Sequence, residues 1–210
     1  MFKNILNKKC YLLIIAFFLF TGCGGGGSAG NAGNEIVLGT TSSFSKLSAE
    51  EEENLNKVGT DQQALLAAIN RERAKQVTCG SKGTFGPVHP LTWNSTLYAS
   101  ALEHVVDLAI SDTFSHDGSG TASDITGNGR PSKFYERIVR NGYNNYYSVG
   151  ENIAGGQRSL DQVMQAWMAS PGHCENIMKS TYTEVGVAIV VNEGSTYQVY
   201  WGQNFGSKRR

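Results

Sequence analysis

Charged residues, cysteine and proline are all scarce in this sequence of 210 residues. Only 17% of the residues are charged, and the chain has four cysteines and four prolines. Its 18 basic residues balance its 18 acidic ones, and no long block of Lys or Arg occurs. A nucleic-acid-binding surface needs such a basic cluster, so we expect no nucleic-acid partner. The 40% of hydrophobic residues is enough for one buried core.

The apolar run from Tyr11 to Phe20 is much shorter than the roughly 20 residues that a membrane-spanning helix needs. Lysines precede it, as in a secretory signal peptide. The run leads into Phe20-Thr21-Gly22-Cys23, which resembles the lipobox of bacterial lipoproteins except that Phe20 stands where an aliphatic residue is usual. The resemblance implies cleavage before Cys23 and lipidation of that cysteine. The alternative is an ordinary secretory signal in which Cys23 is incidental.

A lipid on Cys23 would hold the protein in the cell envelope, outside the cytoplasm. Gly24 follows in place of Asp, so retention in an inner membrane is not indicated, and a host with two membranes would carry the protein in the outer one. The predicted leader removes lysines and no acidic residue, which leaves a slightly acidic chain. Acyl chains, rather than charge, would therefore provide the membrane contact.

The segment after Cys23 has the composition of a tether. It is rich in Gly, Asn, Ser and Ala and then carries an acidic run, Glu50 to Glu53, so it buries little apolar area. Ser48 and Glu51 have capping-box spacing for a short helix, but we predict a tether here. The predicted organisation is a signal peptide over 1–22, a lipidated cysteine and tether over 23–58, a folded domain over 59–206 and a basic tail over 207–210.

Two cysteines, Cys79 and Cys174, remain for the folded domain once Cys10 leaves with the leader and Cys23 carries lipid. Two thiols in an oxidising compartment pair readily, and the predicted disulfide would stabilise by about 4–5 kcal/mol in the chain-entropy model. The alternative is two separately buried thiols. No C-x-x-C occurs, which argues against a zinc knuckle or a redox dithiol.

Within the domain, helical periodicity comes first and strand-like runs come last. Helix starts are predicted at Thr60 with Gln63, at Ser95, at Pro131 and at Ser159 with Gln162. Strands are predicted at 150–154, at Glu184 to Val191 and, after a turn at 192–195, at Thr196 to Phe205. This order indicates an α+β fold with helices packed on a mainly antiparallel sheet.

Five short strings occur in an order and spacing that resemble the CAP superfamily, which comprises cysteine-rich secretory, antigen 5 and pathogenesis-related 1 proteins, in its bacterial branch. They are Pro90-Leu91-Thr92-Trp93-Asn94, Phe114-Ser115-His116-Asp117, Gly150-Glu151-Asn152-Ile153-Ala154, Trp167-Met168-Ala169-Ser170-Pro171-Gly172-His173 and Trp201-Gly202-Gln203-Asn204-Phe205-Gly206. Each string alone is weak, but the ordered set covers about residues 60 to 206. The resemblance implies a three-layer α-β-α sandwich.

The resemblance also implies a large cleft lined by two His and, in eukaryotic members, two Glu. His116, Glu151 and His173 match three of these positions. The second acidic position falls on Ser170, which departs from that pattern, and Glu136 is a substitute carboxylate that spacing alone does not place in the cleft.

Two converging imidazoles suit Zn²⁺ or another divalent cation. His116 and His173 would be the ligands, with Glu151 either a third ligand or a group that orients one imidazole. Against this stands a structural interpretation, in which Glu151 binds backbone donors and His104 is a buried core residue. His89 is expected to be exposed, and the three tryptophans are expected to anchor the core.

Catalytic motifs are missing from the predicted domain. It contains no G-x-S-x-G and no H-E-x-x-H, and Pro171-Gly172 predicts a turn between Ser170 and His173. We therefore favour a non-enzymatic binding module for a small lipid or peptide ligand. A metal-assisted hydrolase acting on protein or cell wall, with cleft residues as catalytic groups, is one alternative. A structural envelope protein with a vestigial cleft is the other.

Overall fold

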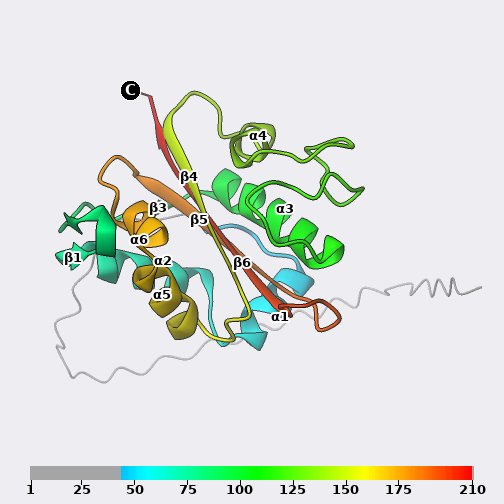
Figure 1. The fold of residues 1–210 in the computed structure, drawn as a ribbon, viewed down its shortest axis with the longest axis horizontal. Coiled ribbons are helices and arrows are strands. Elements are labelled where there is room, and N and C mark those ends of the chain that lie inside the picture. The colour runs from blue at the N-terminus through cyan, green and yellow to red at the C-terminus, as the bar shows by residue number, and fades with distance from the viewer. Residues whose placement is uncertain (1–43, 210) are drawn as a thin grey trace, which may run out of the picture. The chain divides into compact units, whose positions relative to one another are not determined.

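The computed structural model describes residues 44–209 (Figure 1). The helices are α1 (Ala49–Lys57), α2 (Gln62–Arg73), the short 3₁₀ helix η1 (Gly80–Lys82), α3 (Ser95–Ser111), α4 (Phe134–Arg140), α5 (Leu160–Ala169) and α6 (Pro171–Met178). The strands are β1 (Val77–Thr78), β2 (Thr84–Phe85), β3 (Thr92–Trp93), β4 (Tyr146–Gly155), β5 (Glu184–Val191) and β6 (Val199–Lys208). The predicted leader and Cys23 lie outside the described residues.

The main sheet has four strands in the order β3-β5-β6-β4. Strand β3 pairs in parallel with β5, and the other two pairings are antiparallel. Helices α3 and α4 cover one face of this sheet, while α2, α5 and α6 cover the other (Figure 1). The predicted α+β class with a mainly antiparallel sheet in an α-β-α sandwich is confirmed.

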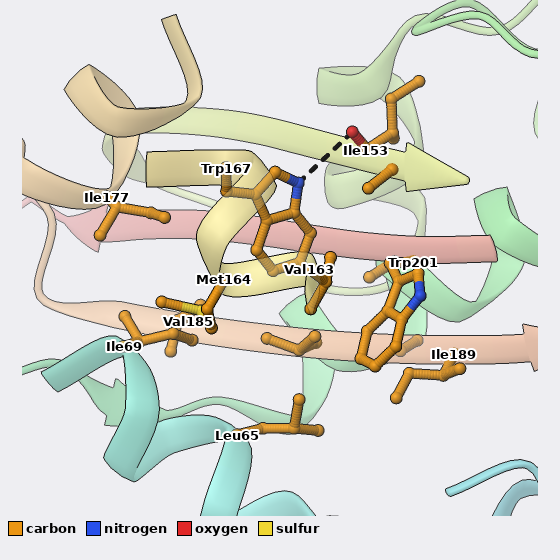
Figure 2. Close-up of a cluster of buried hydrophobic side chains, with 14 of the residues drawn as sticks. Leu65, Ile69, Ile153, Val163, Met164, Trp167, Ile177, Val185, Ile189 and Trp201 are labelled. Atoms are coloured by element: carbon orange, nitrogen blue, oxygen red, sulfur yellow. Dashed lines mark hydrogen bonds between the residues drawn. The ribbon is translucent and has the colours of Figure 1, made fainter. Parts of the chain in front are cut away.

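Large apolar side chains fill the space between the sheet and helices α2, α5 and α6 (Figure 2). Trp167 of α5 and Trp201 of β6 meet edge to face with ring centroids 6.5 Å apart, and both are fully buried. The indole N–H of Trp201 donates to the carbonyl of Gln157 at 2.8 Å, which satisfies its polar atom. Trp93 is also buried, so the prediction that the tryptophans anchor the core is confirmed.

Two glycines on the opposite face of the sheet let α3 lie directly on the strands. A Cβ at Gly186 would stand 2.0 Å from the backbone nitrogen of Tyr98, and one at Gly202 would stand 2.8 Å from Val105. Any side chain larger than hydrogen at Gly186 would therefore force the helix backbone away from β5. This close approach fixes the depth of α3, the helix that carries His104.

The predicted disulfide between Cys79 and Cys174 is present, with the two Cα atoms 5.4 Å apart. It joins the segment before η1 to helix α6 across 95 residues of sequence. Both cysteines are fully buried. The link therefore ties the start of the domain to the helix that carries His173.

Local signals place most elements correctly, with two shifts. Helix α3 begins at Ser95 and α5 follows the Ser159 cap, as predicted. The N-cap of α2 is Asp61 rather than Thr60, because the Asp61 carboxylate accepts from the amide of Ala64 at 2.7 Å. Pro131 stays in the preceding loop, and α4 begins at Phe134, where the Glu136 carboxylate accepts from the amide of Lys133.

The last strand and the Ser170 segment also depart from the predictions. Strand β6 spans 199–208 rather than 196–205, while β5 has the predicted bounds. Pro171 opens helix α6 at its first position, so Pro171-Gly172 is a helix start and not a turn.

Residues 44–58 belong to the folded unit, so the prediction that the tether extends to residue 58 was wrong. Ser48 and Glu51 form the capping box of α1, and Tyr98 of α3 donates to the Glu51 carboxylate at 2.5 Å. Leu55 and Val58 are buried in the main core. The acidic run lies on the solvent-exposed side of α1, while the other side of the helix packs on the core. Composition alone does not distinguish the two sides of a helix.

Within residues 44–209, no helix combines the length and the apolar character that crossing a bilayer requires.

Replacing Gly186 by Ala will destabilise the fold because the new methyl group meets the backbone of α3 rather than a mobile side chain. We expect a loss of at least about 1–3 kcal/mol, the usual cost of overpacking. Urea unfolding followed by circular dichroism measures it. Gly172→Ala is the matched control, because nothing lies within 4 Å of its added Cβ and Ala favours helix formation. A loss no larger for Gly186→Ala than for this control would contradict the close packing.

Candidate functional site

The site is organised around the carboxylate of Glu151, which β4 places on the α3 face of the sheet. Its side chain is only 2% exposed. One oxygen accepts from Nδ1 of His116 at 3.0 Å, and the other accepts from Nη2 of Arg137 at 2.9 Å. Nε2 of His104 stands 3.8 Å from the first oxygen. Four segments far apart in sequence therefore meet at one buried carboxylate.

Arg137 of α4 provides the buried positive charge of this cluster. Its side chain is 1% exposed, and Nη2 also donates to the backbone carbonyl of His116 at 2.9 Å. Nη1 donates to the carbonyl and the hydroxyl of Ser132, at 3.1 and 2.9 Å. The guanidinium thus links Glu151, the backbone of His116 and Ser132, which precedes α4.

The loop that carries His116 is itself fixed by a second buried carboxylate. Asp124 accepts from the amides of Gly120, Gly127 and Ser132, at 3.1, 3.1 and 2.8 Å. A Cβ at Gly118 would stand 2.1 Å from Asp124, so only glycine fits there. Asp124 therefore presents Ser132 to Arg137 and shapes the loop that follows His116.

His116 and His104 are in opposite situations. The His116 imidazole is 52% exposed, and its Nδ1 is taken by Glu151, so Nε2 is the ring atom left for a ligand. The His104 ring is 1% exposed and donates from Nε2 to the carbonyl of Ser115 at 2.9 Å. Its Nδ1 is buried and has no hydrogen-bond partner within the described residues. His104 supports the loop, whereas His116 faces outward.

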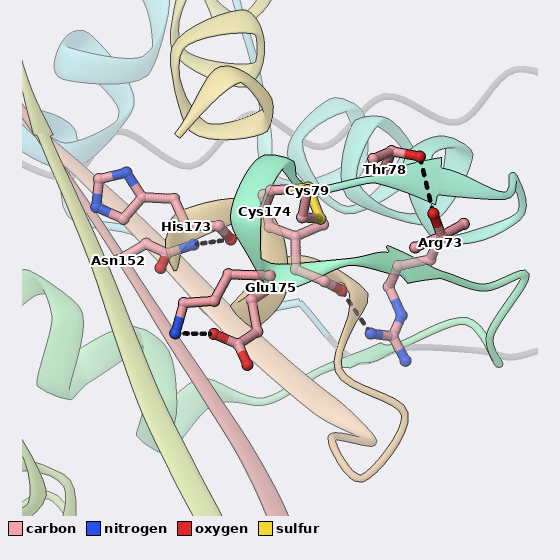
Figure 3. Close-up of a disulfide and its surroundings, with 10 residues drawn as sticks. Arg73, Thr78, Cys79, Asn152, His173, Cys174 and Glu175 are labelled. Atoms are coloured by element: carbon pink, nitrogen blue, oxygen red, sulfur yellow. Dashed lines mark hydrogen bonds and ion pairs between the residues drawn. A yellow bond between two sulfur atoms is a disulfide. The ribbon is translucent and has the colours of Figure 1, made fainter. Parts of the chain in front are cut away.

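His173 enters from the other side of β4, on helix α6. Its backbone carbonyl accepts from the amide of Asn152 at 3.2 Å, and Figure 3 shows its ring on the Asn152 side of the helix, away from the disulfide. Asn176 donates to the Glu151 carbonyl and to the Asn152 side chain, at 3.2 and 2.9 Å. These asparagines therefore bind α6 to β4, and Asn204 similarly donates to Ser100 of α3 at 3.0 Å.

The charges of the cluster shift its pKa values in different directions. Burial by itself raises the pKa of Glu151, but the charge of His104, the His116 hydrogen bond and Arg137 outweigh it, so the pKa is lowered. Burial lowers the pKa of His104, although the negative charge of Glu151 opposes this shift. The hydrogen bond to Glu151 raises the pKa of His116. Burial and then the His116 charge lower the pKa of His173, so the two imidazoles influence each other.

Two further predicted site residues, Ser170 and Glu136, have structural roles in the fold. The Ser170 hydroxyl forms no hydrogen bond with His173 within residues 44–209, and the residue joins α5 to α6. Glu136 is 27% exposed and pairs with Arg130 at 2.7 Å while capping α4. Arg130 and the Lys133 amide lower its pKa to about 2. Its oxygens are thus already used outside the Glu151 cluster.

Metal-ligating groups are few in this site. Among residues 44–209, no three or more His, Cys, Asp or Glu side chains are grouped so that they could hold a metal ion. Both Glu151 oxygens accept hydrogen bonds, so the carboxylate orients His116. The described residues therefore offer at most two imidazoles to a cation.

Arg137 was not predicted as a member of the site, and His104 was predicted only as a core residue. His104 is buried as predicted, yet it also lies beside Glu151. Arg137 follows Glu136 directly, and a basic residue one turn into a short amphipathic helix gives no signal that it points inward. His89 is exposed, as predicted.

Two pockets lie away from this cluster. One, of about 570 Å³, runs along the outer side of α3. The other, of about 260 Å³, lies between α2 and α5 and includes Ala68, Met164 and Met168. Neither is lined by His116, Glu151 or His173.

Comparison with known proteins gives consistent matches to this architecture. A sequence model of the cysteine-rich secretory protein (CAP) family matches residues 66–205. The chain is 30% identical over 166 residues to the uncharacterized protein YkwD of Bacillus subtilis (strain 168), a match that covers 79% of this chain and 50% of that relative. The chain thus spans about half the length of this curated relative.

Two solved structures share the fold at lower sequence identity. An extracellular SCP-domain protein of Bacillus anthracis str. Ames is 21% identical with a TM-score of 0.54, over 79% of this chain and 45% of that one. An outer surface protein of Borrelia burgdorferi is 20% identical with a TM-score of 0.55, over 70% of this chain and 92% of that one.

Replacing Glu151 by Gln will lower the pKa of His116 toward its ordinary value, because the amide accepts a hydrogen bond without carrying negative charge. Titration of the imidazole by NMR measures this shift. The same change leaves the Arg137 charge buried without its counter-ion, and we expect it to cost about 3–5 kcal/mol of stability. Glu136→Gln, which breaks a partly exposed pair, is the control and should cost much less stability.

The pH dependence of stability follows from the same contacts. His116 has a raised pKa, so its contribution is complete below about pH 6.5, the value of the free group, and is lost as the pH rises through the raised pKa. Glu151 has a lowered pKa, so its contribution is present above pH 4.5 and is lost as the pH falls through the lowered pKa. In the NMR titration, a His116 pKa that is the same in the native chain and in Glu151→Gln would contradict the effect assigned to the Glu151 hydrogen bond.

Proposed function

Because the chain belongs to the cysteine-rich secretory protein (CAP) family, we propose that it is an extracytoplasmic binding module held at the cell envelope. The family match covers most of the folded residues. The names of two proteins with the same fold describe one as extracellular and the other as an outer surface protein. The Cys79–Cys174 disulfide suits an oxidising compartment. A lipid on Cys23, outside the described residues, would be the anchor.

The binding site in this proposal is the surface that His116 and His173 share, with a small lipid or peptide as the ligand. The observation that carries it is the use of both Glu151 oxygens inside the fold, by His116 and Arg137. The buried carboxylate then acts as an orienter that keeps Nε2 of His116 outward, and it is not free to attack a substrate or to transfer a proton. Such an arrangement presents hydrogen-bonding imidazoles to a ligand without supplying a nucleophile.

A divalent cation fits the site only as a weakly bound ion with the two imidazoles as its protein ligands. Catalytic Zn²⁺ sites normally use three protein ligands, and the described residues offer two. A cation here would be held by His116 and His173, would complete its coordination with water, and would supply a Lewis acid. Glu151 would fix the orientation of His116 from behind, as carboxylates do for ligating histidines.

A metal-assisted hydrolase is the second candidate, and the His116–Glu151 hydrogen bond is the observation that favours it. A carboxylate behind an imidazole is the arrangement that fixes the tautomer of a catalytic histidine. His116 and His173 would then hold the cation, Glu151 would fix the tautomer of His116, and the cation would supply the Lewis acid. Turnover of a protein or cell-wall substrate that disappears in His116→Ala would support this candidate over simple binding.

Removing both imidazoles, as His116→Ala/His173→Ala, will abolish Zn²⁺ binding by the purified chain while leaving it folded, because neither ring is fully buried. Glu151→Gln should weaken Zn²⁺ binding by about 10–100-fold through loss of orientation. Calorimetric titration measures both effects. His89→Ala is the control, since His89 is exposed and outside the site. Binding that survives the double substitution would remove the metal from the proposal.

Native mass spectrometry after incubation with lipid extracts and peptide mixtures tests the ligand itself. We expect an adduct on the native chain that is absent from His116→Ala/His173→Ala and retained by His89→Ala. An adduct retained equally by all three chains would place the ligand elsewhere.

Replacing Cys23 by Ala will release the protein from the membrane fraction, because the lipid would be its only strong membrane contact. Metabolic labelling with an alkyne fatty acid, followed by fractionation, measures both lipidation and location. The expected result is label on the native chain and none on the variant, while Cys10→Ala keeps its label. Membrane retention of an unlabelled Cys23→Ala chain would contradict the anchor.

A further inference from the structure

The larger pocket, of about 570 Å³, forms a groove on the side of α3 that faces away from the sheet. Its floor consists of residues that recur at helical spacing: Ser95, Tyr98, Ala99, Leu102, Glu103 and Val106. They cover about 16 Å of helix at 1.5 Å per residue. One wall is the segment from Ser45 to Glu51, and the other includes Ser123, Ile125 and Asn141.

The floor of this α3 groove offers apolar surface with few free polar atoms. Ala99, Leu102 and Val106 are only partly covered, and Ile125 on the wall is 53% exposed. Glu103 is already bonded, since it accepts from Thr126 and from the Asn141 amide at 2.7 Å. A partner therefore meets an apolar stripe whose neighbouring polar groups are satisfied by one another.

The rim of the α3 groove carries an excess of negative charge. Glu51 lines it, while its neighbours in α1, Glu50 and Glu52, do not line the pocket themselves but are exposed and form no ion pair within residues 44–209. Lys46 is the only basic residue among those that line the pocket, and Arg140 pairs with the lining residue Glu103 at 3.3 Å, so the unpaired acids are those of α1. The electrostatic complement of this rim is a cation.

From the apolar floor and the acidic rim we propose that the α3 groove docks a short basic amphipathic peptide segment of a partner protein. Apolar side chains of the segment lie on Ala99, Leu102 and Val106, while its Lys or Arg residues pair with the glutamates of α1. This is the helix-in-groove mode, in which apolar anchors give affinity and charge selects the partner. The site goes beyond the proposed function and shares no residue with the His116–His173 surface.

The test is fluorescence anisotropy of a labelled amphipathic peptide of leucine and lysine, about 12 residues long, with the purified full chain. Val106→Trp fills the groove floor and should weaken binding about tenfold or more by steric exclusion. Ile110→Trp is the matched control on the same helix, since Ile110 is 67% exposed and does not line the pocket. A peptide that binds elsewhere on the protein, or to detergent micelles in the sample, would bind Val106→Trp and Ile110→Trp equally well.

Charge is tested separately with Glu50→Gln/Glu52→Gln, which should weaken binding a few-fold and flatten its salt dependence. Glu193→Gln, an exposed acid in the β5–β6 turn, is the control. A peptide with glutamate in place of lysine should not bind. Equal affinity of Val106→Trp and Ile110→Trp, or equal binding of the acidic peptide, would overturn the proposal. Zn²⁺ titration of Val106→Trp should match the native chain, so the two sites fail or succeed independently.

Discussion

The ion pair between Glu151 and Arg137 is the contact on which the arrangement of the site depends. Removing two charges from water costs several kcal/mol for each ion, and only close pairing with further hydrogen bonds offsets that cost. Here the partners complete one another: Arg137 spans Glu151, the His116 backbone and Ser132, while Glu151 spans Arg137 and the His116 ring. Any displacement of α4 or of the His116 loop would leave a buried charge unpaired.

That constraint is connected to the core through the sheet. Strand β4 holds Glu151 on the α3 face and Asn152 on the α6 face, because successive side chains of a strand point in opposite directions. Asn152 bonds to Gln203 of β6 and to α6, and α6 is tied by the disulfide to the segment before η1. The two histidines of the proposed site therefore approach β4 from opposite helical layers. Glu151 of β4 holds the His116 ring, and Asn152 of β4 holds the His173 backbone.

The inner and outer sides of α3 have different roles. Its inner side is pressed onto Gly186 and Gly202, which makes its position rigid, and it delivers His104 to the Glu151 cluster. Its outer side remains partly open between α1 and the loop around Ile125, and it forms the α3 groove. A rigid helix with one buried and one accessible side is suited to recognition, because binding on the open side orders little that is not already ordered.

Local chemistry, readable from the sequence alone, determined most of the helices and strands. The Ser159 cap, the start of α3 at Ser95, the β-branched run of β5 and the Cys79–Cys174 pairing all follow from neighbouring residues or from a count of thiols. The ordered strings also identified His116, Glu151 and His173 as residues to be examined together. These signals act over a few residues, or through recurrence of a family pattern, and need no knowledge of packing.

Only the tertiary structure decided which side chains meet. Arg137 reads as an ordinary helix residue, and becomes the counter-ion of Glu151 because α4 packs beside α3 and β4. The acidic segment before residue 58 reads as solvated, and becomes α1 because Leu55 and Val58 find apolar partners contributed by distant parts of the chain. Burial, and the pairing that burial demands, depend on contacts between residues remote in sequence, which local periodicity does not encode.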